Sequence, residues 1–527
     1  MMMPSHHWAR NFTVEKDDIE YLTNLLLERE TPLDTETLTR VLIESRINTE
    51  VATLRQRYQD ARVYDPARAY QIGQKLIFTD FDYETAVVVG TRIGNNPDYG
   101  AFNVLAVQFD DDDLNIDDKP REFASELTVE HDLNQEGEVD DSIGSVNDLN
   151  ADDILATSGK ELTKKVEDKL RASPDLIYMA RLWFPRDLLM DVNVGHLNLA
   201  EAVLDINGGG PMSTETILGE MGGLGKAPQA LQIFSLNYGL NNDSRFDEVG
   251  PTGEVLWHLT RLEPEEVQHT PAMLRYTPIE YDRNLLTKEL ITIENEIDDE
   301  HSSTEDVGNI DQTQITLTYP HRRLGTLPLS DRTSVIFPTA RQTLHVAFSL
   351  VDGQDGEEYP AWVVRKERYV YGLAKFYRKH KLPIGAYVTV SKSDEAGKVV
   401  VNFKAHKPRT EWIRLIVPKA DQITFENHKR AIGAEYDDLM ILGAEDLAGV
   451  DALFTNAQQQ KKSLVAILRS IIPPLGLLTP QGTVHAKTIY SAVNVLRRCP
   501  PGPIFAVLIA NPDFQNVGGD YWKLSND

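Results

Sequence analysis

The sequence predicts an α+β protein of several domains, in which helical modules that end in β-hairpins, a small β-barrel and a larger central β-barrel are joined by acidic linkers. Three observations predict this organisation. Residues 343–350 alternate apolar and polar side chains with the two-residue period of a half-buried strand, and further strand patterns follow up to residue 417. Residues 197–262 and 462–524 share one order of helices and turns, which indicates an internal repeat. Acidic runs separate the patterned segments, and 527 residues are enough for about three to four domains.

The composition limits the classes of protein to which the chain can belong. Its formal net charge of −28 argues against a protein that coats nucleic acid along its whole surface. The single cysteine, Cys499, excludes an intramolecular disulfide and fits a reducing compartment. No apolar run approaches the roughly 20 residues of a membrane helix, and residues 1–12 lack the apolar core of a signal peptide. We therefore expect a cytoplasmic protein with no membrane partner.

The N-terminal region predicts two small domains. Residues 1–64 are expected to form a helical, HTH-like domain, because apolar side chains in Asp17–Leu27 recur at helical spacing and two further helical patterns follow. The arginines of this region are interpreted as a solvated helix face. Residues 65–109 contain three or four short strand patterns separated by turn residues, and they predict a small β-barrel or meander.

Two acidic linkers are expected, at residues 110–165 and 286–312. Within residues 110–153, seventeen acidic residues stand against two basic ones, a composition typical of a solvated segment. The run Asp110–Asp113 lacks the spaced oxygen ligands and the glycine of a calcium loop, so no metal is expected there. One hypothesis is that these linkers mimic a polyanion and cover a basic surface of the protein when nucleic acid is absent.

The repeated segments belong to two expected domains, residues 166–285 and 461–527, and residues 421–460 are expected to connect the second to the central domain. Each repeat has three helices and a glycine-containing hairpin that ends in Trp-x-Leu. Three helices capped by a two-stranded hairpin make a winged helix (HTH). The pattern resembles the HARE-HTH family, which occurs in chromatin proteins, in restriction systems and in the delta subunit of bacterial RNA polymerase. The resemblance implies DNA, RNA polymerase or another protein as the partner.

The two repeats differ in charge. The third helix of the first repeat, expected at residues 227–240, contains no lysine or arginine, which favours a structural or protein-contact role over groove reading. The C-terminal repeat carries Lys487, Arg497 and Arg498, which are secondary nucleic-acid candidates.

The central domain, residues 313–420, combines strands with an amphipathic helix at Gly372–Lys381. Its pattern resembles the DNA-binding pseudobarrel of plant auxin-response-type transcription factors, a fold that recognition domains of some restriction enzymes share. The residues that carry the resemblance are Trp362, Tyr369–Val370, Gly372–Phe376 and Ile384–Val388. Leu373 stands where the family has a tryptophan, and Ala386 where it has an aspartate. The resemblance implies that loops and strand ends on one side of the barrel grip DNA.

Local charge agrees with a polyanion site in this domain. Residues 320–417 contain seventeen Lys and Arg against nine Asp and Glu, the reverse of the whole chain. The candidate nucleic-acid contacts are Arg322, Arg323, Arg332, Arg341, Arg365, Lys366, Arg368, Lys404, Lys407 and Arg409. The alternative is that these cations face the acidic segments of the same protein.

The sequence contains no P-loop, G-x-S-x-G, H-E-x-x-H or C-x-x-C motif, and Cys499 has no evident histidine partner. We therefore expect no catalysis, no cofactor and no metal. The leading hypothesis is a non-catalytic DNA-binding protein, a transcriptional regulator or nucleoid-associated protein that binds duplex DNA through the central barrel. The alternatives are a protein-interaction scaffold attached to the transcription machinery and a recognition subunit of a restriction or defence system.

Overall fold

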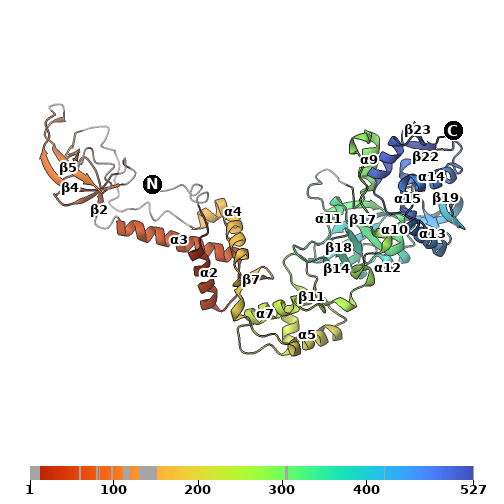
Figure 1. The fold of residues 1–527 in the computed structure, drawn as a ribbon, viewed down its shortest axis with the longest axis horizontal. Helices are drawn as coiled ribbons and strands as arrows, with labels where there is room; N and C mark the ends of the chain where they lie inside the picture. The colour runs from red at the N-terminus through yellow and green to blue at the C-terminus, as the bar shows by residue number, and fades with distance from the viewer. Residues whose placement is uncertain are drawn as a thin grey trace. The chain divides into compact units, whose positions relative to one another are not determined.

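The chain contains both helices and strands, and the strands of the described residues form six sheets (Figure 1). The computed structural model describes residues 12–57, 61–78, 81, 84–96, 99–110, 119–129, 151–302, 307–420 and 422–525. The chain divides into two units, residues 1–191 with 225–235 and residues 192–224 with 236–527. The expected mixture of helices and strands is confirmed.

The first unit contains a module of three helices and a three-stranded sheet. Its elements are α2 (Lys16–Arg29), β1 (Leu33–Asp34), α3 (Thr35–Arg57), α4 (Ala151–Ala172), β7 (Leu176–Met179) and β8 (Leu182–Pro185), with sheet order β1-β8-β7. Apolar side chains from the three helices, among them Leu22, Leu42 and Leu162, are buried around Trp183. The helical spacing of the apolar residues in 17–27 therefore predicted α2 correctly, but α4, β7 and β8 of the module lie beyond the expected boundary at residue 64.

A five-stranded sheet separates α3 from α4 in the sequence. Its strands are β2 (Ala61–Val63), β3 (Lys75–Phe78), β4 (Glu84–Ile93), β5 (Asn103–Phe109) and β6 (Arg121–Ser125), in sequence order across the sheet. Phe78, Phe109 and Phe123 pack in its aromatic core. The expected linker at 110–165 is therefore wrong at both ends, because β6 pairs with β5 and the helix α4 buries Leu162. Residues 130–150 of that linker lie outside the described residues.

Two further copies of the order helix, strand, helix, helix, strand, strand follow along the chain. The first consists of α5 (Val194–Ile206), β9 (Met212–Ser213), α6 (Thr214–Met221), α7 (Gln229–Asn241), β10 (Phe246–Glu248) and β11 (Leu256–Leu259). The second consists of α14 (Leu464–Gly476), β22 (Val484–His485), α15 (Ala486–Leu496), α16 (Pro501–Ala510), β23 (Phe514–Gly518) and β24 (Tyr521–Leu524). The order of elements predicted for both repeats is thus present.

All three modules place a tryptophan at the same register. In each sheet the last strand lies between the other two, and its tryptophan pairs with a residue of the first strand. The pairs are Leu33 with Trp183, Met212 with Trp257, and Val484 with Trp522. The third copy of the repeat, at 16–185, was missed in the sequence because the five-stranded sheet separates its second helix from its third.

A seven-stranded half-barrel forms the centre of the second unit. Its strands are β12 (Gln312–Thr316), β13 (Thr326–Pro328), β14 (His345–Asp352), β15 (Glu358–Val364), β16 (Tyr369–Tyr371), β17 (Tyr387–Lys392) and β18 (Lys398–Phe403), in the order β12-β17-β18-β14-β15-β16-β13. The helices α10 (Tyr319–Leu324), α11 (Asp331–Ser334) and α12 (Ala374–Lys379) accompany it. Phe376 and Tyr377 of α12 are buried in its core, as the amphipathic pattern predicted. Gly372, at φ +124, allows the chain to pass Pro360, because a Cβ there would lie 2.7 Å from the Pro360 carbonyl oxygen.

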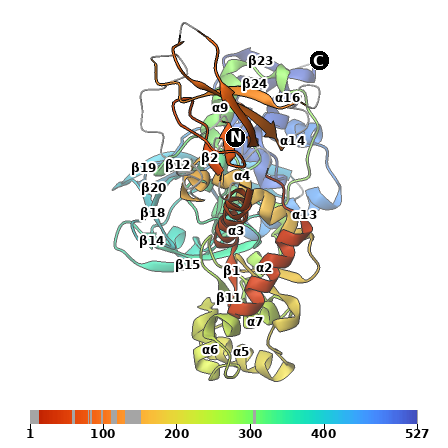
Figure 2. The same ribbon diagram turned by 90° about the vertical axis from the view of Figure 1, so that its left-hand side faces the viewer.

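A long hairpin follows the half-barrel. It consists of β19 (Ala405–Lys419) and β20 (Gln422–Ala434), which lie side by side (Figure 2), and the short strand β21 (Gly443–Ala444) pairs with β19. The boundary at residue 420 and the connector at 421–460 are therefore wrong. Strand β20 runs antiparallel along β19, and α13 (Leu447–Gln459) packs Val450 into the core beyond it.

The second expected linker, 286–312, is also wrong over most of its length. Its first part forms α9 (Lys288–Ile297), which contributes Leu290, Ile293 and Ile297 to a core that includes α15 and α16. Glu294, Asp298, Asp299 and Glu300 are buried instead of solvated. Buried carboxylates need partners, and the partners of Asp299 and Glu300 lie far along the chain, at Tyr490 and Arg498.

The remaining short helices are α8 (Glu265–Gln268) and 3₁₀ turns at Arg186–Leu188, Thr260–Leu262, Ala272–Leu274 and Arg283–Leu285.

Candidate nucleic-acid interface

The ten predicted contact residues of the central domain divide into two groups. Arg341, Lys366, Lys407 and Arg409 are exposed, and no described residue forms an ion pair or side-chain hydrogen bond with them. Arg332 is half-buried and lies within electrostatic range of Asp298. The exposed cations of the first group are available to a polyanion.

The other five predicted cations bind groups of the protein itself. Arg322 donates to the Leu382 carbonyl oxygen at 2.6 Å, and Arg365 to the Thr343 carbonyl oxygen at 2.5 Å. Three are paired with carboxylates: Arg323 with Asp451 at 2.7 Å, Arg368 with Asp331 at 2.6 Å, and Lys404 with Glu435 at 2.8 Å. Such pairs hold local structure, and they weaken the case for Arg322, Arg365 and Arg368 as phosphate ligands.

The three secondary candidates of the C-terminal repeat also serve internal contacts. Lys487 lies between Glu296, at 2.7 Å, and Asp437, at 2.9 Å. Arg497 donates to the Lys462 carbonyl oxygen at 3.2 Å. Arg498 is buried, and its guanidinium pairs with Asp299 and Glu300, both at 2.7 Å. The nucleic-acid role expected for Arg498 is wrong, because a buried group cannot reach a phosphate.

The hairpin β19–β20 brings exposed cations together with an exposed aromatic side chain. Trp412 is 67% exposed, and it pairs across the hairpin with Lys429. The ammonium of Lys429 lies 5.0 Å from the centroid of the Trp412 ring. Thr410 and Ala431, two residues further along the strands, continue the same exposed face.

The opposite face and the turn of the hairpin anchor it to the second unit. Ile413 and Ile432 pack against Leu442 on the opposite face. Toward the turn, Ile416 and Phe425 enter the core shared with α13 and α14. The hairpin is therefore held firmly at one end and on one side, while the face that carries Trp412 remains open.

We call this segment the basic hairpin and define it by its residues Lys404, Lys407, Arg409, Trp412, Lys429 and Arg430. The strand register places Arg409 and Arg430 on the face opposite to Trp412 and Lys429. Residues 404–434 contain seven Lys and Arg against three Asp and Glu. Arg430 pairs with Glu445 at 3.1 Å, whereas no described carboxylate pairs with Lys407, Arg409 or Lys429. Lys429 and Arg430 were not among the contacts predicted from the sequence, although the alternating pattern of 422–434 after the turn was a usable signal.

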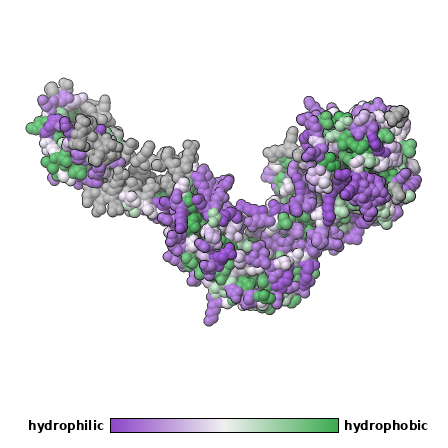
Figure 3. Space-filling model, viewed as in Figure 1, coloured by the Kyte–Doolittle hydropathy of each residue, from purple (hydrophilic) through white to green (hydrophobic). Residues whose placement is uncertain are grey.

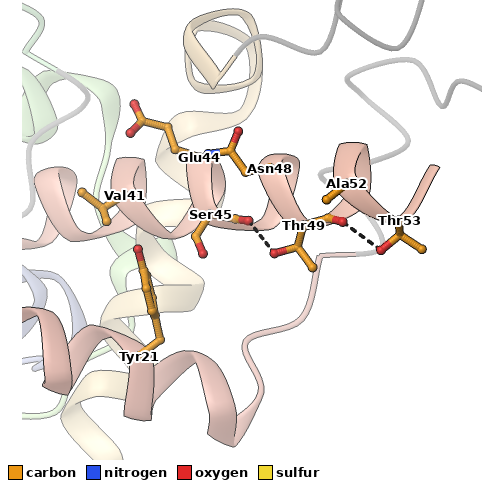
Figure 4. Close-up of a pocket in the computed structure, with 8 residues that line it drawn as sticks. All are labelled: Tyr21, Val41, Glu44, Ser45, Asn48, Thr49, Ala52 and Thr53. Carbon is orange, nitrogen blue, oxygen red and sulfur yellow. Dashed lines mark hydrogen bonds between the residues drawn. The ribbon is translucent and has the colours of Figure 1, made fainter. Parts of the chain in front are cut away.

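A groove on the first unit has no lysine or arginine among its lining residues (Figure 4). It has a volume of about 520 Å³ and lies along α2 and α3. Its lining residues are Tyr21, Val41, Glu44, Ser45, Asn48, Thr49, Ala52 and Thr53. Thr49 and Thr53 donate to the carbonyl oxygens of Ser45 and Thr49, one helical turn earlier. The hydroxyl groups are therefore committed to the helix, and Glu44 is the only carboxylate among the lining residues.

Cys499 lacks the properties of a catalytic thiol. It is buried, and burial raises the pKa of its thiol to about 12, so the reactive thiolate is scarce near neutral pH.

The face in Figure 3 is mainly hydrophilic with separate hydrophobic patches. Within the part of the chain that the structure describes, no helix has the length and apolar character needed to cross a membrane. Comparisons with protein-family models, curated proteins and solved structures found no match.

Proposed function

We propose that this chain is a non-catalytic DNA-binding protein whose basic hairpin, β19–β20, contacts duplex DNA. The observation that carries the proposal is the exposed Trp412 beside Lys429, with Lys407 and Arg409 unpaired among the described residues. The DNA major groove is about 12 Å wide and admits a two-stranded β-ribbon. Residues 409–414 of β19 and 427–432 of β20 form such a two-stranded ribbon, since β21 pairs with β19 at Leu415 and Ile416.

The half-barrel and the modules provide the framework in this proposal. The chain passes from β18 into β19 after Phe403, so the hairpin extends directly from the half-barrel. Arg341 and Lys366 are exposed on the same domain and would add phosphate contacts. The resemblances to pseudobarrel and winged-helix families support a role as a transcriptional regulator or nucleoid-associated protein.

A second candidate function is a scaffold that binds protein, with RNA polymerase as one possible partner. It is favoured by the module of α5, α6 and α7, because Val194, Leu199 and Ile206 of α5 are exposed and Ile206 is 85% exposed. The helix α7 contains no lysine or arginine. Exposed apolar side chains beside a helix without cations are better suited to a protein surface than to phosphates.

The experiment that tests the proposal is fluorescence anisotropy of labelled duplex DNA with the full chain, titrated across salt. Each neutralised phosphate contributes about 0.9 to the slope of log affinity against log salt concentration. The triple variant K407A/R409A/K429A should therefore reduce the slope by about 2 to 3. W412A should weaken binding without changing the slope, because the indole carries no charge.

A matched control removes three cations elsewhere. Lys160, Lys164 and Lys169 are exposed on α4 in the first unit, and the variant K160A/K164A/K169A changes the net charge by the same amount. It should leave the slope unchanged. If both triple variants lower the affinity equally, the effect is net charge and not the hairpin. If the wild-type chain binds no DNA at low salt, the scaffold function replaces this one.

A further inference from the structure

Three side chains with metal-binding atoms converge in the second unit. Asp247 lies in β10, Glu263 follows the 3₁₀ turn Thr260–Leu262, and His345 begins β14. One ligand atom from each lies within 4.8 Å of the others. The His345 Nδ1 atom is 3.0 Å from a carboxylate oxygen of Asp247 and 3.4 Å from a carboxylate oxygen of Glu263.

Glu263 is the unusual member of this cluster. Its side chain is 1% exposed, and neither carboxylate oxygen accepts a hydrogen bond from a described residue. A buried carboxylate without hydrogen bonds is costly unless a cation or a proton compensates it. Its two neighbours remain partly accessible, at 33% for Asp247 and 18% for His345, so an ion can reach the cluster from one side.

The backbone around the cluster is well supported. The Ala347 amide donates to the Val249 carbonyl oxygen at 2.9 Å, which joins the segment after β10 to β14. Val249, Ala347 and Trp362 pack in one apolar cluster beneath this joint. The ring of His258, from β11, lies edge-on to Trp362 at 5.0 Å between centroids. The three ligand residues are thus carried by segments that pack against one another.

We propose that Asp247, Glu263 and His345 bind a divalent transition-metal ion, with Zn²⁺ as the best fit. Bonds of about 2.0 to 2.1 Å in a tetrahedral site place ligand atoms about 3.3 Å apart, close to the separations around His345 Nδ1. An imidazole nitrogen with two carboxylates suits Zn²⁺ better than Mg²⁺ or Ca²⁺, which prefer oxygen ligands throughout. Three protein ligands leave the fourth position to water on the accessible side.

The ion would join the module of α5–α7 to the half-barrel, because its ligands come from both. It would also neutralise Glu263, for which the described residues offer no compensating partner besides the proton of His345. The competing arrangement is a metal-free one, in which a protonated His345 lies between the two carboxylates. The two arrangements differ in whether the chain takes up one equivalent of metal.

The test uses the full chain after treatment with a chelator and dialysis. Isothermal titration with Zn²⁺ should give one saturable site per chain, and Zn²⁺ should raise the thermal unfolding temperature. H345A and E263Q should each remove the saturable site. In the wild-type chain, Co²⁺ should give the visible absorption of tetrahedral nitrogen and oxygen coordination, and Zn²⁺ should displace it, which tests the site without any variant.

His428 provides the matched control. It also faces two carboxylates, Glu426 at 3.2 Å and Glu445 at 3.8 Å, but it lies on the hairpin and outside the cluster. H428A should bind Zn²⁺ as the wild type does. The proposal fails if the wild type takes up no more Zn²⁺ than H345A, or if H428A loses the site as H345A does.

Discussion

The three modules each bury a tryptophan, but the hydrogen bond of its indole N–H differs between them. Trp183 donates to the Thr35 hydroxyl at 2.9 Å. Trp257 has two acceptors, the Thr214 hydroxyl at 3.0 Å and the Asn237 side chain at 2.9 Å. The Trp522 indole has no acceptor among the described residues, and the position that corresponds to Thr35 and Thr214 is Ala486.

This difference predicts unequal effects of one substitution. Thr35→Ala leaves the buried Trp183 N–H unsatisfied and should destabilise the first unit by about 1 to 3 kcal/mol. Thr214→Ala should cost less at the second module, because Asn237 still accepts from Trp257. Urea unfolding followed by tryptophan fluorescence measures both changes. Equal losses from the two variants would show that the threonine hydroxyls do not act through the indoles.

Arg498 is the residue on which the buried acidic segment depends most. Its guanidinium contacts Asp299, Glu300 and the Asn494 side chain, and the Tyr490 hydroxyl donates to Asp299. Arg498→Met should destabilise the second unit by about 3 to 5 kcal/mol, because two carboxylates lose their buried cation. Arg497→Met is the control, since the Arg497 side chain donates to a backbone carbonyl and pairs with no carboxylate of the described residues. Thermal unfolding of both variants measures the difference.

The ion pair between Arg498 and Glu300 predicts that the stability of the second unit depends on pH. Burial alone would raise the pKa of Glu300, but Arg498 and His321 hold it well below its usual range. The ionised Glu300 therefore stabilises the wild type above a pH of about 4.5, and this contribution is lost only as the pH falls below that value. In Arg498→Met the lone carboxylate is relieved by protonation, so the deficit should be largest near neutral pH and should shrink on acidification. A constant deficit between about pH 7 and pH 4 would contradict this account.

At the scale of elements, the sequence predicted those parts whose signal is local. The alternation in 343–350 and the strand patterns after it indicated the half-barrel strands, and the apolar spacing of 372–381 indicated α12, because these signals depend on neighbouring residues. The order of elements in the two repeats was visible for the same reason. Each of these segments buries one face, and burial of one face imposes a period on the sequence.

The parts that could not be predicted depend on contacts between distant residues. Acidic residues 298–300 have the composition of a linker, and they become part of a core through partners that are distant in the sequence, among them Ser330, Tyr490 and Arg498. The candidate contacts show the same limit. Charge alone did not distinguish Arg368, which pairs with Asp331, from Lys407, which stays unpaired among the described residues.

At the scale of the whole molecule, the proposed DNA contact must overcome a formal net charge of −28. Internal ion pairs such as those of Asp299 and Glu300 neutralise only part of the negative charge. The rest repels a polyanion over a distance of about 10 Å at 0.1 M salt. The basic hairpin is therefore expected to bind DNA more weakly in this chain than its own cations would allow.

Residues 130–150 are the acidic segment best suited to weaken DNA binding by the basic hairpin. They contain seven acidic residues and no lysine or arginine, and they lie outside the described residues. Replacing them with an uncharged Gly-Ser segment of equal length should raise the affinity for duplex DNA at low salt, and the gain should disappear at high salt because screening removes the repulsion. Anisotropy with the same labelled duplex measures the change.

The control must separate a local competitor from a change in net charge. Seven Glu→Gln and Asp→Asn substitutions at exposed acidic residues on other elements remove the same charge without altering residues 130–150. If the segment competes with DNA for the basic hairpin, its replacement should raise the affinity more than the control does, and K407A/R409A/K429A should abolish the difference. If both changes raise the affinity equally, the segment acts only through net charge, and the hypothesis that it covers the hairpin is wrong.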